Sequence, residues 1–349
     1  MSKLSSASFK IDSNFGTGST GNVQSIRDLA TSTQESGFDA IWSSEAKHDP
    51  FLPLLVAAEA TSTLTVGTSI AVAFARSPMT LAQTAYDLQF LTKGRFILGL
   101  GSQVKPHIQR RFSMPWSEPA PRMREYVQAL KAIWTAWQEE TPLRFVGEHY
   151  KHTLMTPFFS PDSHSFGPPP VYVAAVGSVM TKVAGEVADG VILHGFTTRR
   201  YIDEVSLPAV SAGLKQANRD EGACAISLMG FVVSGDTSEE MDRAAAAVRA
   251  QIGFYGSTPA YRAVLELHGW GELADTLSDL ARQGGEAWAT MGEHISDSVL
   301  EEFAVIAPRN ELAAAITLRF EGVLDRFSFY VPYEVPNGFW DPVVRDLRA

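Results

Sequence analysis

Cysteine is nearly absent from this chain of 349 residues, in which Cys224 is the only one. A single thiol excludes an intrachain disulfide and any metal site built from several cysteines. No uninterrupted apolar run approaches the length that spans a bilayer, and residues 1–10 lack the apolar stretch of a signal peptide. We therefore expect a soluble cytoplasmic protein that does not bind membranes.

Positive charge is also scarce, because 29 Lys and Arg residues face 39 Asp and Glu residues and leave a net charge of −10. A protein that binds nucleic acid through its phosphates needs a basic surface, so we expect no nucleic-acid partner. The His residues are scattered and the H-E-x-x-H pattern is missing, which disfavours a metal hydrolase, and we predict no metal site. The P-loop spacing is missing as well.

What the sequence does contain is a regular alternation of short apolar runs and longer amphipathic stretches. This alternation is typical of βαβ units and a parallel sheet. Eight runs count as strands, so we predict the α/β class and a single (β/α)8 TIM barrel. The predicted strands cover residues 9–13, 40–43, 64–72, 96–100, 171–174, 191–194, 226–233 and 326–331. The predicted helices cover residues 23–36, 52–61, 79–91, 122–137, 179–187, 201–219, 239–252 and 311–320.

Two segments interrupt this alternation. Residues 140–170 are rich in proline and are predicted to form an insertion with a small hairpin, whereas residues 253–309 contain several short helical patterns. No linker separates the halves of the chain, so we predict one domain over residues 1–349. An open doubly wound sheet fits the same alternation, but the first strand lacks the G-x-G-x-x-G turn that such sheets use for dinucleotides.

Glycines mark three places where a ligand could approach the backbone. Gly99 and Gly101 follow closely in the strand of GRFILGLGSQ, and Gly67 interrupts the strand VGTSIAV, where we expect a bulge. In PVYVAAVGSVMTKVAGEVADG a strand runs through Gly177 and Ser178 into a helix. The free N–H groups at that helix start suit a phosphate, and Ser178 could cap the helix. A capped helix that binds no ligand would show the same sequence pattern.

These segments, together with ESGFDAIW and their order along the chain, resemble the luciferase-like superfamily over residues 9–320. The resemblance is to the branch that uses the deazaflavin coenzyme F420. The stretch GLGSQVKPHIQRRFSMPW is similar to the methylene-tetrahydromethanopterin reductase-like subgroup. Relatives are commonly homodimers, so the resemblance also implies a homodimer. It does not identify the substrate, which we expect to be a small molecule or a peptide.

The resemblance implies a cofactor site at the C-terminal ends of the strands. In related proteins a non-prolyl cis peptide at the bulge of the third strand supports the flavin ring, and here it falls between Ser69 and Ile70. Glu45 corresponds to an acidic position near the cofactor, and Ser102 and Gln103 correspond to positions at the ring edge. Asp12, at the end of the first predicted strand, is a weaker candidate. The predicted cofactor-binding residues are Asp12, Glu45, Thr68, Ser69, Ile70, Ser102, Gln103, Ala175, Val176, Gly177, Ser178, Val179 and Met180.

The candidate catalytic residues are His194, Glu45 and His48. His194 ends the sixth predicted strand, where barrel catalysis occurs, and an imidazole titrates in a range that suits a proton donor. The sequence departs from the sugar-phosphate dehydrogenases of the family at Ala46, where they carry histidine, and at Val104, where they carry glutamate. His48 could replace the missing histidine, or it could simply bond a neighbouring carboxylate such as Asp49.

Three functions remain open at this point. The first is an F420-dependent oxidoreductase that transfers hydride between reduced deazaflavin and a C=C or C=N bond of a small molecule or modified peptide. The second is an FMN-dependent monooxygenase of the luciferase type on the same barrel. The third is a flavin-binding homologue without turnover. Lys105, Arg110 and Arg111 follow the fourth strand, where they could attract the anionic tail of F420 or form a solvated basic face.

Overall fold

The computed structural model describes residues 9–16 and 21–348, so the expectation about residues 1–10 falls mostly outside it. Within the described ranges, no helix combines the length and the apolar character that crossing a bilayer would require.

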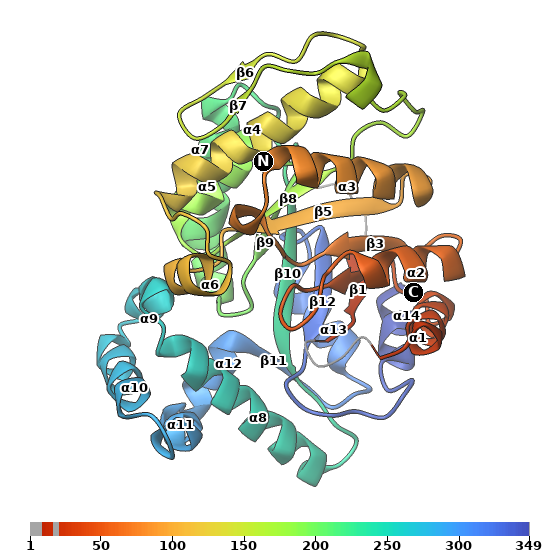
Figure 1. The fold of residues 1–349 in the computed structure, drawn as a ribbon. Helices are drawn as coiled ribbons and strands as arrows, with labels where there is room; N and C mark the ends of the chain where they lie inside the picture. The colour runs from red at the N-terminus through yellow and green to blue at the C-terminus, as the bar shows by residue number, and fades with distance from the viewer. Residues whose placement is uncertain (1–8, 17–20, 349) are drawn as a thin grey trace.

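Eight parallel strands close into a barrel (Figure 1). Each pairs with the next in the order β1, β2, β3, β5, β8, β9, β10 and β12, and β12 pairs back with β1. These runs are buried almost throughout, as strands covered on both faces must be. Every strand coincides with a predicted one, which confirms the TIM barrel. The strands are Lys10–Asn14 (β1), Ala40–Ser43 (β2), Thr65–Thr68 (β3), Phe96–Gly101 (β5), Val171–Ala175 (β8), Gly190–Leu193 (β9), Ala225–Val233 (β10) and Arg326–Tyr330 (β12).

Helices surround the barrel, and several begin at caps that the sequence encodes. Ser77 accepts a hydrogen bond from the N–H of Thr80 and precedes Pro78, the first residue of α3. Gly37 follows α1 with φ +87°, as expected of a residue that ends a helix. The surrounding helices are Val23–Glu35 (α1), Leu52–Ala60 (α2), Pro78–Leu91 (α3), Pro119–Gln138 (α4), Ser178–Val187 (α5), Leu207–Gln216 (α7), Leu312–Phe320 (α13) and Asp341–Arg348 (α14).

The helix predicted over residues 201–219 is divided in the structure. It begins as α6 (Arg199–Tyr201), passes through the π turn η4 (Ile202–Ser206) and continues as α7. Pro208 lies in the first turn of α7 and lacks the N–H that a continuous α-helix would use there. The wider turn accommodates this proline without ending the helical path.

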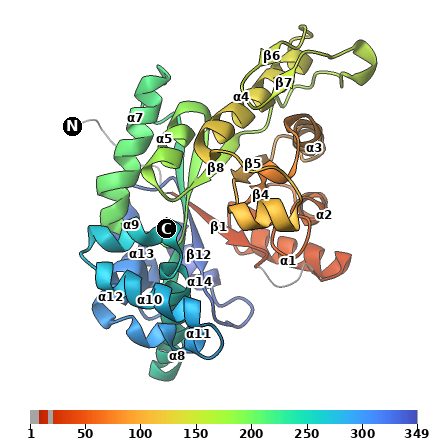
Figure 2. The same ribbon diagram turned by 60° about the vertical axis from the view of Figure 1, so that its left-hand side comes forward.

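Both predicted insertions project from the barrel, on opposite sides of the molecule (Figure 2). The first carries the expected hairpin, in which β6 (Phe145–Val146) pairs antiparallel with β7 (Lys151–His152). The second joins the helix predicted over residues 239–252 in a helical group around its own hydrophobic cluster, which the sequence did not reveal. That group contains Ser238–Gly256 (α8), Arg262–Leu267 (α9), Gly271–Gln283 (α10), Ala287–Thr290 (α11) and Asp297–Phe303 (α12).

Several shorter elements complete the chain. A further strand, β11 (Ala304–Ile306), pairs with the end of β10 at Phe231–Val233. The last two residues of the third predicted strand form a separate short strand, β4 (Ala71–Val72), which pairs with β5. The remaining turns are Ala73–Ala75 (η1), His107–Arg111 (η2), Pro157–Phe159 (η3), Pro259–Tyr261 (η5) and Met291–His294 (η6).

Candidate active site at the barrel mouth

The interior of the barrel is filled by large side chains that glycines accommodate. A Cβ on Gly67 would lie 2.4 Å from the Trp42 ring, and one on Gly190 would lie 2.6 Å from the Tyr172 ring. Gly67 is therefore small because an aromatic ring occupies its space. This packing leaves the barrel closed beneath its C-terminal mouth.

Asp12 belongs to this filled interior. Its carboxylate is 1% exposed and accepts hydrogen bonds from Arg326 at 2.7 and 2.8 Å and from the Trp42 indole at 2.9 Å. Both carboxylate oxygens are thus committed to neighbours within the barrel. The structure places this predicted cofactor residue below the mouth, in an internal ion pair that joins β1 to β12.

Above this layer lies a cavity of about 420 Å³. Trp42, Ile192 and Met229 contribute apolar surface to it, while serines, amides and two tyrosines contribute polar groups. Ser69 is the one predicted cofactor residue in its lining. The residues that line the cavity are Asn14, Gly16, Trp42, Ser44, Ser69, Ile192, Ser227, Met229, Gln251, Tyr255, Ser328, Phe329, Tyr330, Val331 and Pro332.

The predicted bulge lies between β3 and β4, and its Ser69–Ile70 peptide bond is cis, as the resemblance implied. Thr68 is fully buried, and its hydroxyl is bonded to the backbone of Gly99. A Cβ on Gly99 would lie 1.8 Å from the carbonyl oxygen of Thr68, and one on Gly101 would lie 2.7 Å from the Ile70 side chain. These glycines therefore make room for the bulge, and not directly for a ligand as the sequence had indicated.

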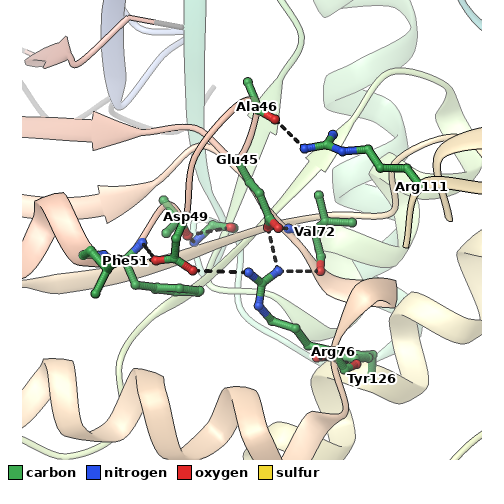
Figure 3. A network of polar contacts seen from close by, with 11 residues as sticks. Glu45, Ala46, Asp49, Phe51, Val72, Arg76, Arg111 and Tyr126 are labelled. Carbon is green, nitrogen blue, oxygen red and sulfur yellow. Dashed lines mark hydrogen bonds and ion pairs between the residues drawn. The ribbon is translucent and has the colours of Figure 1, made fainter. Parts of the chain in front are cut away.

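Glu45 lies after β2 and is held by the segment that follows the bulge. Its carboxylate accepts hydrogen bonds from the N–H of Val72 at 2.7 Å and from Arg76 at 2.6 Å. Figure 3 shows the guanidinium of Arg76 between the carboxylates of Glu45 and Asp49. Asp49 in turn accepts from the first N–H groups of α2, and His48 beside it is exposed. In this arrangement Glu45 holds the loop after β2 to the segment that follows the bulge.

The residues predicted at the ring edge lie on the loop that leaves β5. Ser102 and Gln103 are half-buried, and Gln103 adopts φ +57°. Lys105, Arg110 and Arg111 follow on an exposed segment. Arg111 donates a hydrogen bond to the carbonyl oxygen of Ala46, so this basic segment reaches across to the loop after β2 (Figure 3).

The predicted phosphate site is the start of α5. The N-cap is Gly177 and not Ser178, and no side chain caps this helix end. A Cβ on Gly177 would meet no atom within 4 Å, so the turn faces open space. Its neighbours Ala175 and Val176 are buried and half-buried respectively. Gly177, Ser178, Val179 and Met180 line a groove together with residues 118–121, which begin α4. The first N–H groups of α5 are free here and suit an anion. The start of α4 adds little, because Pro119 and Pro121 have no N–H and Glu118 brings a carboxylate to the groove.

His194 follows β9 and is enclosed by aromatic rings. It stacks on Tyr261 at 4.6 Å and meets the edge of Tyr255 at 4.7 Å. Burial lowers the pKa of His194 to about 4, so the ring is neutral near pH 7. Its Nδ1 accepts from the N–H of Phe196, which leaves the proton on Nε2, facing the hydroxyl of Tyr261. The ordinary titration range that suggested a proton donor does not apply to this histidine.

The structure brings the bulge, the Glu45 loop, the β5 loop and the start of α5 to one end of the barrel, because all the strands are parallel. It also adds residues that the sequence did not predict. These are Gln251 and Tyr255 of α8, Tyr330 of the last strand, and the serines of β10 and β12. Ser227 and Ser328 carried a signal, since each is a polar residue that alternates with apolar ones in a buried strand. Gln251 and Tyr255 lie four residues apart on one face of α8.

Comparisons with known proteins agree with this fold. The uncharacterised protein Rv1360 of Mycobacterium tuberculosis is 52% identical over 299 residues, covering 86% of this chain and 87% of the relative. The 5,10-methylenetetrahydromethanopterin reductase of Archaeoglobus fulgidus is 26% identical over 281 residues, covering 78% and 79% of the two chains. The coenzyme F420-dependent tetrahydromethanopterin reductase of Methanopyrus kandleri superposes with a TM-score of 0.76 at 18% identity, covering 98% of this chain and 97% of the other.

The resemblance seen in the sequence is thereby confirmed. Because the profile of the luciferase-like monooxygenase family matches residues 4–326, the chain belongs to that family.

Proposed function

We propose that this protein is an F420-dependent oxidoreductase that transfers hydride between reduced deazaflavin and a C=C or C=N bond of a small molecule or modified peptide. The observation that carries the proposal is the uncapped N-terminus of α5 at the barrel mouth, beside an open Gly177. Backbone donors there suit the phosphate that F420 carries. F420 is favoured over FMN by the methylenetetrahydromethanopterin reductase relative together with the F420-dependent structural neighbour.

The residues present fit the cofactor in three respects. The bulge at Ser69 and Ile70 borders the cavity and offers backbone to a flat ring. The groove at Gly177 and Ser178 has room for a phosphate. The exposed Lys105 and Arg110 supply positive charge for a glutamate tail in a chain that is otherwise acidic. When bound, the deazaflavin would supply the hydride chemistry.

The protein's own residues would position the substrate and keep water out. The aromatic rings around His194 form an apolar surface. The neutral His194 ring donates a hydrogen bond from Nε2 to the hydroxyl of Tyr261 and does not supply an ionisable proton. Glu45 holds the loop after β2 against Val72 and Arg76, which keeps the rim of the site in place. His194 and Glu45 therefore act in this proposal as positioning residues.

An FMN-dependent monooxygenase is the second candidate, because FMN also carries a phosphate and a tricyclic ring. The description of the family, luciferase-like monooxygenase, supports this second candidate. The two differ in oxygen chemistry, since FMN reacts readily with oxygen whereas a deazaflavin, with carbon at position five, does not.

The test is to express the protein in an F420-producing host and to identify the bound cofactor by absorbance and mass. Reduced F420 is then mixed with unsaturated acceptors without oxygen, and its oxidation is followed by absorbance in a single turnover. Retention of F420 and oxidation that depends on the acceptor are expected. Retention of FMN with oxygen-dependent turnover would establish the second candidate. Cofactor binding with no oxidation by any acceptor would favour a flavin-binding homologue without turnover.

A further inference from the structure

The cavity at the barrel mouth has a lining without charge. None of the described residues that line it is Asp, Glu, Lys, Arg or His. The charged pair Asp12 and Arg326 lies beneath the floor and is satisfied internally. A carboxylate or phosphate placed here would lose its water and find no opposite charge, which is strongly unfavourable.

Polar groups nevertheless surround the cavity, and several of them lack a partner. Ser227 and Ser328 are each 6% exposed and lie on adjacent strands, where Met229 pairs with Ser328. Among the described residues, none forms a hydrogen bond with either hydroxyl or with the amide of Gln251. Buried polar groups are normally paired, so these hydroxyls are available to a ligand in the cavity.

Two tyrosines contribute a further donor. The hydroxyls of Tyr255, on α8, and Tyr330, at the end of β12, lie 2.6 Å apart. One hydroxyl proton is shared between the two oxygens, and the other remains free to donate to a third group. Burial raises the pKa of both residues, so both stay protonated. Tyr330 stacks on Phe231 at 4.6 Å, which fixes the direction of the pair.

We propose that the substrate bound in this cavity, beside the cofactor ring, is uncharged and carries a carbonyl or hydroxyl oxygen that accepts a hydrogen bond from the Tyr255–Tyr330 pair. The inference rests on the proposed function in taking this substrate to be the hydride acceptor. It narrows the acceptor to compounds such as neutral enones, and it makes the tyrosine pair a determinant of specificity.

The test measures equilibrium binding to the protein loaded with oxidised cofactor, by ligand-observed NMR. The probes are cyclohex-2-en-1-one, the oxygen-free cyclohexene, and the anionic 3-oxocyclohex-1-ene-1-carboxylate. We expect the enone to bind about tenfold more tightly than either of the others, the effect of one hydrogen bond in a site that excludes water. Equal affinity for the anion, or no binding of the enone, would overturn the inference.

Two variants test whether the tyrosine pair causes the preference for the enone over cyclohexene. Tyr255→Phe and Tyr330→Phe should each weaken enone binding about fivefold to tenfold and leave cyclohexene binding unchanged. Tyr201→Phe should change neither, because Tyr201 of α6 packs in the hydrophobic cluster of the second insertion and lies outside the cavity lining. If both cavity variants bind the enone as the wild type does, the pair is not the donor and the inference fails.

A charge placed at the rim provides the converse test. Ser44→Lys should improve binding of the carboxylate probe about tenfold, whereas Ser62→Lys on an exposed loop should not.

Turnover with reduced F420 separates the two proposals. Selective enone binding without hydride transfer would contradict the proposed function alone, and hydride transfer to the anion but not to the enone would contradict this inference alone.

Discussion

Thr68 and Gly99 are joined by two hydrogen bonds through one side chain. The Thr68 hydroxyl donates to the carbonyl oxygen of Gly99 at 2.7 Å and accepts from its N–H at 2.9 Å. The paired residues of β3 and β5 end at Gly67 and Ile97, and pairing resumes between β4 and Leu100. The threonine therefore satisfies backbone groups that the bulge would otherwise leave without partners.

Replacing Gly99 with alanine should destabilise the protein by about 3 kcal/mol or more, because the new Cβ would lie 1.8 Å from a backbone oxygen that cannot easily move. Urea denaturation of the purified variant measures the loss. Gly177→Ala is the matched control, since its Cβ would enter open space at a φ of −84°. Equal stability of the two variants would mean that β5 does not approach the bulge as closely as described.

His194 should make unfolding depend on pH in a defined direction. Its pKa of about 4 in the folded protein lies below the ordinary value of 6.5, so the unfolded chain binds this proton more tightly. The free energy of unfolding is unaffected above pH 6.5 and falls as the pH drops from 6.5 towards 4. Between about pH 7.5 and pH 5 the contribution is about 2 kcal/mol.

The measurement is urea denaturation of wild type and His194→Asn at both pH values. Asparagine can still accept the hydrogen bond from Phe196, and it does not titrate. The variant should lose this part of the pH dependence, and His48→Gln, at an exposed position, should keep it. An unchanged pH dependence in His194→Asn would show that the ring titrates normally.

The contact between Glu45 and Arg76 should show substantial energetic coupling. The Glu45 side chain is 7% exposed and that of Arg76 is 21% exposed, so water screens the pair only partly. A double-mutant cycle with Glu45→Gln and Arg76→Gln should give about 1–3 kcal/mol in the free energy of unfolding. The exposed pair Glu239 and Arg243 should give less than about 0.5 kcal/mol in the same experiment. Similar values for the two pairs would contradict the role assigned to Glu45.

The start of α5 allows one backbone donor to be removed without a change of fold. Ser178 is the first helical residue, where proline is well tolerated, and the extended Gly177 before it is compatible with a following proline. Ser178→Pro should therefore keep the thermal stability and weaken cofactor binding about tenfold, measured by fluorescence titration with F420. Ser178→Ala keeps the N–H and should bind the cofactor nearly as the wild type does. Unaltered affinity in Ser178→Pro would place the phosphate elsewhere.

The barrel could be predicted from the sequence because each strand is a buried run bounded by turns, a local property. The position of Asp12 could not. The predicted first strand ended at Ser13, which put Asp12 next to the mouth, whereas β1 continues to Asn14 and leaves Asp12 one layer deeper. Side chains alternate along a strand, so a shift of one residue at its end changes which side chain reaches the ligand.

The polar lining of the cavity depends on contacts that no local pattern contains. Tyr255 and Tyr330 are 75 residues apart, and they meet because the second insertion folds back over the end of β12. The neutral state of His194 likewise follows from rings contributed by that insertion. The second insertion thus supplies one hydroxyl of the tyrosine pair and the rings around His194.

Trp42 is both a filler of the barrel and part of the cavity surface, and Gly67 on the neighbouring strand makes room for its indole ring. The depth of the cavity can therefore be changed at Gly67, a residue that does not line it. Alanine at position 67 would displace the indole and reshape the cavity, while a smaller ring at position 42 would enlarge it. The volume of this cavity can therefore be changed by exchanging bulk between two neighbouring strands, without altering any residue of the turn at Gly177.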